Sequence, residues 1–387
     1  MSVLIRFVAV VTALVLGAAA PVVPSDGLFD AVKPDQGLRP APGTQTITVF
    51  RPHAGDDAYA NGVVLFPFKG RLYAQWQSSQ KDEDSPDTHV VFASSPDGVH
   101  WTKPRNLIGP AAKFGMHSSG GWWSDGNTLT AFINRWPEGF RKADGSHPGG
   151  QAYYAESRDG VRWSGLRPVR GADGRPVDGI IEQDPHRIAS GRIVTAFHLR
   201  PGMIATPFYT DDPAARGGWH RGVMTNMPHD GDVSRELEPS LFQRPDGTLV
   251  MIFRDEGSSF RLLASESADE GAHWSTPVVT EFSDARAKLS AGTLPDGTAF
   301  IVNAPGGTKL RAPLAVSLSV DGRNFTRSYV LRGTDAVKPP RQPGQYKRPG
   351  FHYPKSVVWN GYLYVGYSDA KEDVLITRVP VAALQAK

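Results

Sequence analysis

The stretch SESADEGAHWS, residues 265–275, gathers a serine, two acidic residues, a glycine and a tryptophan. Looser copies of it recur as Ser95-Pro-Asp97-Gly98-Val-His-Trp101, Ser157-Arg-Asp159-Gly160-Val-Arg-Trp163 and Ser319-Val-Asp321-Gly322-Arg-Asn-Phe325. In a tight turn, aspartate and serine accept backbone N–H bonds, glycine takes a positive φ, and the aromatic side chain packs beneath the turn. We therefore interpret Asp269 and its counterparts as turn formers rather than catalysts.

The spacing of these turns indicates a repeat. Successive aspartates are 62, 110 and 52 residues apart, and the long step is nearly a double one. Thr210-Asp211-Asp212, followed by Trp219, lies inside that step as a degraded copy.

A second repeat lies between these turns and has the form strand, turn, strand. The six segments are VVLFPFKGRLYAQW, GGWWSDGNTLTAFIN, PHRIASGRIVTAFH, PSLFQRPDGTLVMIF, SAGTLPDGTAFIVN and SVVWNGYLYVGYS. Their turn centres lie 50 to 65 residues apart, a period that suits four-stranded propeller blades. The sequence therefore predicts an all-β fold, a six-bladed β-propeller over residues 45–387. We expect the strand 45–50 to pair with 373–379 and close the ring.

Composition excludes several classes of protein. The chain has 387 residues, a net charge of +3 and no basic tract, which argues against nucleic acid as a partner. It has no cysteine, so disulfides and cysteine chemistry are excluded. Its Asp and His residues are scattered without ligand spacing, so we expect neither a metal nor a cofactor, and we expect a monomer.

The first 20 residues have the pattern of a secretory signal. Arg6 precedes an apolar run, and the small residues 17–20 follow it. The run is too short to span a membrane, so we expect cleavage and a periplasmic or secreted protein without a membrane span. Residues 21–44 are rich in Pro, Gly and Asp without periodicity, and we interpret them as a linker.

The start of each inner strand should lie at one end of the central funnel. Counting back seven or eight residues from each turn centre gives one mouth position per blade, namely Asn61, His117, Glu182 or Gln183, Glu238, Lys288 and Tyr353. Nearly all are polar, although strongly apolar strands follow them. In the fourth hairpin, the turn at 244–248 places Glu238 opposite Arg254, close enough for a charge pair.

The turns that contain Asp97, Asp159, Asp269 and Asp321 resemble the Asp-boxes of the sialidase superfamily. The sixfold repeat and a Glu that lies sixteen residues before an Arg are also similar to that superfamily. The resemblance implies an exo-acting glycosidase for a terminal sugar of an acidic oligosaccharide or polysaccharide. It implies Tyr353 as nucleophile, Glu238 as its base and Asp84 as acid–base residue, with Arg254 and Arg311 holding the carboxylate. A phenol, whose pKa is about 10, becomes nucleophilic when a carboxylate accepts its proton. Tyrosine suits an anionic sugar because a neutral attacker avoids repulsion between carboxylates.

The sequence departs from the sialidase pattern at the first clamp arginine. Asn61 stands in that stretch, and Arg51 is too far along the chain from Asp84 to replace it. His117, at a mouth position, and His352, beside Tyr353, favour a second hypothesis. Propellers that act on rhamnose–glucuronate linkages, as hydrolases or lyases, use a mouth histidine, and His117 with Arg254 could play that part. The third hypothesis is a propeller that binds glycans without catalysing a reaction.

Overall fold

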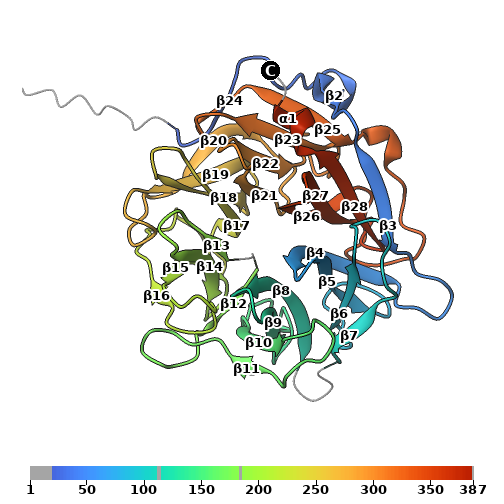
Figure 1. The fold of residues 1–387 in the computed structure, drawn as a ribbon, viewed down its shortest axis with the longest axis vertical. Helices are drawn as coiled ribbons and strands as arrows, with labels where there is room; N and C mark the ends of the chain where they lie inside the picture. The colour runs from blue at the N-terminus through green and yellow to red at the C-terminus, as the bar shows by residue number, and fades with distance from the viewer. Residues whose placement is uncertain (1–19, 111–114, 183–184, 386–387) are drawn as a thin grey trace, which may run out of the picture.

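The computed structural model describes residues 20–110, 115–182 and 185–385. It confirms the predicted all-β fold, with six sheets arranged in a ring as the blades of a propeller (Figure 1). The inner strands surround the centre, and the third is divided in two. In order they are β4 (Tyr59–Phe68), β8 (Met116–Ser124), β12 (Gly179–Ile181) with β13 (His186–Arg187), β17 (Glu236–Gln243), β21 (Ser290–Thr293) and β26 (Phe351–Trp359).

Each blade continues outward through antiparallel neighbours. The second strands are β5 (Arg71–Ser79), β9 (Leu129–Trp136), β14 (Ile193–Leu199), β18 (Leu249–Asp255), β22 (Ala299–Asn303) and β27 (Tyr362–Asp369). The third strands are β6 (His89–Ser95), β10 (Gln151–Ser157), β15 (Ile204–Thr210), β19 (Arg261–Ser267), β23 (Leu314–Ser319) and β28 (Asp373–Pro380). The outer strands are β7 (Arg105–Ile108), β11 (Arg167–Pro168), β16 (His220–Arg221), β20 (Val278–Ser283), β25 (Arg327–Arg332) and β3 (Gln45–Phe50).

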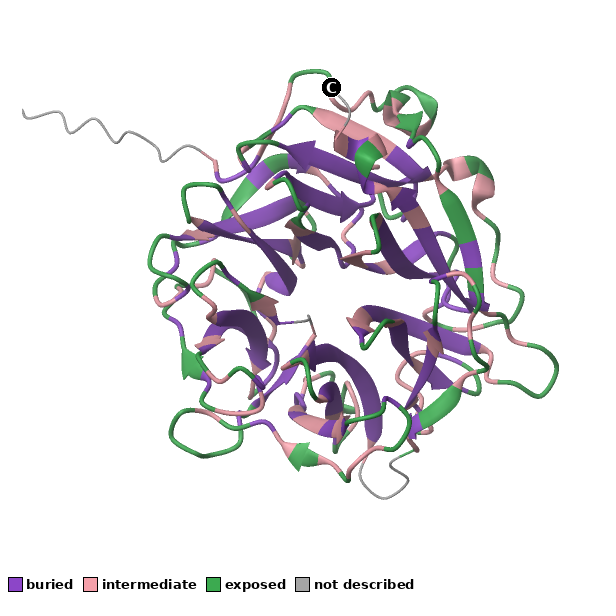
Figure 2. Cartoon of the chain, viewed as in Figure 1, coloured by how far each residue is buried: buried purple, intermediate pink, exposed green. Residues whose placement is uncertain are grey.

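The ring closes as the sequence predicts, through the outermost strand of blade six. That strand, β3, comes from the N-terminal part of the chain and pairs antiparallel with β28, with Ile47 opposite Ile376. The apolar core lies between neighbouring blades. Val63, Leu65 and Trp76 of blade one, for example, pack with Val374 and Ile376 of blade six. Figure 2 shows the result, with buried residues along the strands and exposed ones in the peripheral loops.

The Asp-box turns have the predicted geometry. In the last one, Asp321 Oδ1 accepts from the backbone N–H groups of Arg323 at 2.8 Å and Asn324 at 2.7 Å, and from Ser319 Oγ at 2.8 Å. The degraded copy works in the same way, since Asp212 Oδ1 accepts from the N–H of Ala214 at 3.0 Å. These carboxylates therefore stabilise turns at the periphery of the ring.

We expect the substitution Asp321→Ala to lower the free energy of unfolding by about 1 kcal/mol, because hydrogen bonds to a carboxylate are lost at a partly solvated turn. The pKa of Asp321 is lowered: burial opposes the shift, but the hydrogen bonds from Asn324 and Arg323 outweigh it. The stabilisation is therefore fully present above the pKa of an unfolded aspartate and is lost progressively as pH falls from that value through the lower pKa of the folded state. Urea unfolding at pH 7 and pH 3 measures this, with Asp26→Ala as an exposed control. Equal losses for both variants at pH 7 would contradict the prediction.

Residues 21–44, which the sequence predicts as a linker, pack against the ring. β1 (Val23–Pro24) pairs in parallel with β24 (Asn324–Phe325), and β2 (Arg39–Pro40) adds to the edge of β25. Arg244 donates to the carbonyl of Pro21 from a buried position. The compositional signal for a linker reflects the lack of long strands, and it does not reveal these contacts. The signal sequence proposed for residues 1–20 lies almost entirely outside the described residues. Within the described part of the chain, no helix has the length and apolarity needed to cross a bilayer.

Candidate active site

The propeller topology brings the starts of the inner strands and the turns between second and third strands to the same end of the ring. A cavity of about 590 Å³ opens there. Five of the side chains predicted for the site line it, namely Asp84, Glu238, Arg254, Arg311 and Tyr353. Glu182 and Lys288, predicted for the mouths of blades three and five, line it too, and Lys288 Nζ lies 3.3 Å from Glu182 Oε2.

Glu238 and Tyr353 share an unusual backbone. Both lie in the left-handed region, with φ of 53° and 55° respectively, and each interrupts the pairing of its inner strand. Such β-bulges turn side chains out of the normal alternation, and left-handed non-glycine residues concentrate at functional sites. Gly62 occupies the corresponding bulge of blade one with φ of 65°. The strained positions thus point the two central side chains into the cavity.

The predicted charge pair between Glu238 and Arg254 is confirmed. Arg254 Nη1 donates to Glu238 Oε2 at 3.0 Å, and its Nη2 donates to Glu256 Oε2 at 2.6 Å. The register differs by one residue, because the bulge places Leu237 opposite Arg254. Burial alone would raise the pKa of Glu238, but the charges of Arg254, Lys288 and Arg311 outweigh it and lower that pKa. Glu238 is therefore an ionised carboxylate at neutral pH.

The phenol of Tyr353 lies among cations. Arg311 Cζ, Lys288 Nζ and Lys371 Nζ lie 5.0, 5.5 and 5.6 Å from the centre of its ring. Burial raises the pKa of Tyr353, and the negative charge of Glu238 raises it further, while Arg311 opposes them. Tyr353 is thus a protonated phenol at neutral pH.

Asp84 belongs to an acidic run in the loop between β5 and β6. Burial and the neighbouring charge of Glu83 raise the pKa of Asp84 to about 7. Its two neighbours are bound elsewhere, since Glu83 pairs with Lys371 and accepts from Asn61 Nδ2 at 3.2 Å, while Asp82 accepts from backbone N–H groups of residues 345 and 346. A carboxyl group that changes protonation near neutral pH can both donate and accept a proton.

Three residues predicted for the site do not line the cavity. His117 alternates with Met116 and Ser118, which do, so its ring turns the other way, and its Nδ1 lies 3.0 Å from the carbonyl oxygen of Gly109. His352 lies behind Arg311, whose Nη1 donates to its Nδ1 at 2.8 Å. Asn61 is fully buried, and its Oδ1 accepts from Ser368 Oγ at 2.8 Å. Strand starts alone do not show which neighbour faces inward.

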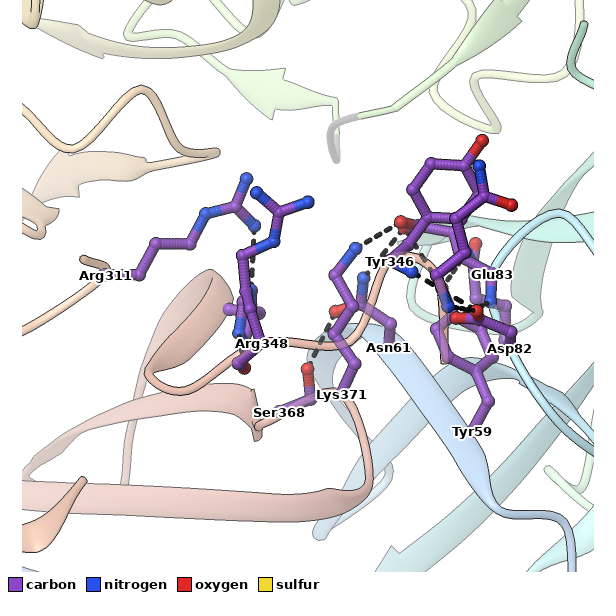
Figure 3. A network of polar contacts seen from close by, with 12 residues as sticks. Tyr59, Asn61, Asp82, Glu83, Arg311, Tyr346, Arg348, Ser368 and Lys371 are labelled. Carbon is purple, nitrogen blue, oxygen red and sulfur yellow. Dashed lines mark hydrogen bonds and ion pairs between the residues drawn. The ribbon is translucent and has the colours of Figure 1, made fainter. Parts of the chain in front are cut away.

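Several lining residues come from the connections between strands rather than from the inner strands themselves. Lys371 lies in the turn between β27 and β28, and Arg348 and Tyr346 lie in the segment before β26 (Figure 3). His147, from the loop between β9 and β10, has its Nδ1 3.1 Å from Asp232 Oδ1. The topology offers a signal for Lys371 and His147, since turns between second and third strands return to the mouth. Arg51, by contrast, pairs with Asp373 at 2.8 Å and does not line the cavity.

A metal site is not indicated by the residues that the structure describes, since no three His, Cys, Asp or Glu side chains among them are grouped to hold an ion.

Comparison with known proteins identifies the fold. One similar solved structure is a sialidase with 19% identity and a TM-score of 0.64. The match covers 93% of this chain but only 35% of the sialidase chain, so this chain spans about a third of that protein. The leech intramolecular trans-sialidase, complexed with 2,7-anhydro-Neu5Ac, has 14% identity and a TM-score of 0.65 over 88% of this chain and 71% of its own. The intramolecular trans-sialidase from Ruminococcus gnavus, in complex with oseltamivir carboxylate, has 15% identity and a TM-score of 0.63 over 88% and 98%.

At the level of sequence, a search of curated proteins gave no match. The pattern of the BNR repeat-like domain, however, matches residues 70–365, which is most of the chain; of the strands of the ring, β3, β4 and β28 lie outside the match. The Asp-box turns described above recur within that range. The protein therefore belongs to the BNR repeat-like domain family and has the propeller fold of the sialidases.

Proposed function

We propose that the protein is an exported, exo-acting glycoside hydrolase that removes a terminal acidic sugar from a glycan. One observation carries the proposal: Tyr353 and Glu238, from two blades, project from strained bulges into a single cavity that also holds Asp84. Its volume of about 590 Å³ suits one or two sugar units. The cations around Tyr353 favour a sugar that carries a carboxylate.

The residues divide the reaction into two displacements. The Tyr353 oxygen attacks the anomeric carbon while Glu238 takes the phenol proton, and Asp84 donates its proton to the departing glycosidic oxygen. Asp84, now ionised, then takes a proton from water. That water attacks the anomeric carbon, and the bond to Tyr353 breaks as Glu238 returns the proton. Arg254 and Arg311 attract the carboxylate of the sugar, and Arg254 also keeps Glu238 ionised.

A second candidate function is favoured by His147. This histidine lines the cavity and replaces His117 as the mouth histidine, and its Nδ1 lies 3.1 Å from Asp232 Oδ1. A histidine base suits a lyase or hydrolase for rhamnose–glucuronate linkages. A lyase of this kind removes the proton at C5 of the uronate, next to its carboxylate group.

The two candidates differ in their products, so one assay distinguishes them. The purified protein is incubated with 4-methylumbelliferyl N-acetylneuraminate, its glucuronide counterpart and a rhamnose–glucuronate oligosaccharide. We expect release of the fluorophore from an acidic glycoside, with no new ultraviolet absorbance from an unsaturated sugar. Absorbance that develops with the oligosaccharide, and is lost in His147→Asn, would favour the lyase. Binding without turnover of any substrate would contradict both and leave a glycan-binding propeller.

A further inference from the structure

Side chains of the second strands join neighbouring blades, because they reach the inner strand of the next blade. Gln75 of blade one donates to the carbonyl of Gly121 in blade two. Asn134 of blade two donates to the carbonyl of Ile181 in blade three at 2.7 Å and accepts from its N–H at 2.9 Å. In blade three, a histidine makes the corresponding contact instead of an amide. This residue is His198 on β14, and it is fully buried.

His198 contacts the strained bulge at Glu238 in blade four. The pairing of β17 with β18 is interrupted there, and the backbone N–H of Glu238 donates to His198 Nε2 at 3.2 Å. A buried N–H group that lacks an acceptor is costly, and the φ of 53° at Glu238 is already unfavourable for a residue with a side chain. The imidazole therefore stabilises the backbone conformation that points the carboxylate of Glu238 into the cavity.

This contact fixes the protonation state of His198. Because Nε2 accepts from an N–H group, the hydrogen of the neutral ring is on Nδ1, which has no hydrogen-bond partner among the described residues. Burial lowers the pKa of His198. Four charged side chains also act on the ring, two carboxylates that oppose the shift and two cations that add to it, namely Glu182, Glu238, Lys288 and Arg254. The ring is therefore neutral at neutral pH, and a second proton, on Nε2, would face the N–H of Glu238 and break the contact.

We propose that His198 is a positioning residue for Glu238, whose bulge it holds so that the carboxylate can take the proton of Tyr353. The inference rests on the proposed function, in which Glu238 is the base, and it extends that function to a residue of another blade that does not line the cavity. Loss of the imidazole would let the bulge relax and would move the carboxylate relative to the phenol, while the side chains that bind the sugar stay in place. The effect should therefore fall on kcat rather than on KM.

The test compares three variants of the whole protein on the acidic 4-methylumbelliferyl glycoside that it cleaves. His198→Leu removes the acceptor, and we expect kcat to fall about ten- to a hundredfold with little change in KM, because a buried N–H group loses its partner. His198→Gln supplies an amide oxygen near the position of Nε2 and should keep most of the activity. Asn134→Leu is the matched control, since it removes the same kind of contact from Ile181, which has no role in the proposed mechanism. It should lower the melting temperature about as much as His198→Leu does and leave kcat of the folded protein near the native value.

Two NMR measurements test the contact without turnover. In protein labelled with [15N]histidine, the ring signals that disappear in His198→Gln should show a protonated Nδ1 and a bare Nε2 at pH 7. Hydrogen exchange of the Glu238 amide should be about tenfold faster or more in His198→Leu, but not in His198→Gln. If both results are found and no glycoside is cleaved, the positioning contact stands and the hydrolase proposal falls. If glycosides are cleaved but His198→Leu keeps the native kcat, or loses no more than Asn134→Leu, the hydrolase stands and the inference is wrong. A ring that carries its proton on Nε2 at pH 7 would also overturn it.

Discussion

Replacing Tyr353 with phenylalanine is expected to abolish turnover of acidic glycosides, with a fall in kcat on the order of 10⁴-fold or more. The substitution removes only the phenol oxygen, which in the proposed mechanism attacks the anomeric carbon. The ring stays among Arg311, Lys288 and Lys371, so the cations keep their positions. Binding of the sugar should therefore change little, and the loss should appear in kcat rather than in the affinity for N-acetylneuraminic or glucuronic acid.

Tyr346 provides the matched control for this variant. It also lines the cavity, but it lies on the segment before β26 and has no carboxylate placed to take its proton in the proposed mechanism. Tyr346→Phe should retain most of the activity. If Tyr353→Phe kept a tenth or more of the native kcat, the nucleophile would have to be another group, and Glu238 would be the first to examine. If both tyrosine variants lost activity equally, the cavity would have been disturbed as a whole.

The second large effect is expected for Asp84→Asn, which removes the carboxyl group that protonates the leaving oxygen in the proposed mechanism. General acid catalysis of this kind contributes about 10²- to 10⁴-fold. Because the pKa of Asp84 is raised to about 7, kcat/KM of the native protein should fall as pH rises through that value. The variant should lack this alkaline limb. It should also lose less activity on an aryl glycoside, whose leaving group needs little protonation, than on a disaccharide.

Stability gives an independent measurement of the same pKa. Burial raises the pKa of Asp84 from 3.8 to about 7, so ionisation of the folded protein is unfavourable. The native protein should lose stability as pH rises from about 4 to 7, because the unfolded chain releases this proton first. Asp84→Asn should therefore be more stable than the native protein at pH 8 and equally stable at pH 3. Asp87→Asn, in the same loop, serves as the control. Equal stabilities of Asp84→Asn and the native protein at both pH values would show that Asp84 is not buried as described.

The sequence predicted the fold well because the fold depends on local signals. The Asp-box turns use neighbouring residues, and each hairpin pairs strands that adjoin in the chain, so counting from turn centres located the mouth of four blades. The charge pair of Glu238 and Arg254 was found in this way. Closure of the ring by residues 45–50 was also accessible, since the repeat leaves one strand missing at the C-terminal end.

The rest of the cavity depends on features that a count along the chain does not reveal. A bulge changes which neighbour faces inward, and the counting rule therefore placed His117 at the mouth, whereas Met116 and Ser118 line it. Arg348 and Lys371 reach the cavity from a long loop and a tight turn, and their proximity to Arg311 is a tertiary contact between blades. The sequence also did not predict the contacts of residues 21–44 with the ring, because strands of two residues leave no periodic pattern.

The pairing of β3 with β28 also has a consequence for biogenesis. Blade six combines residues 45–50 with residues 351–380, so it cannot be complete until synthesis of the chain has passed residue 380. That blade carries Tyr353 and Lys371. The cavity residues of blade six would therefore take their places only after the other five blades have been synthesised.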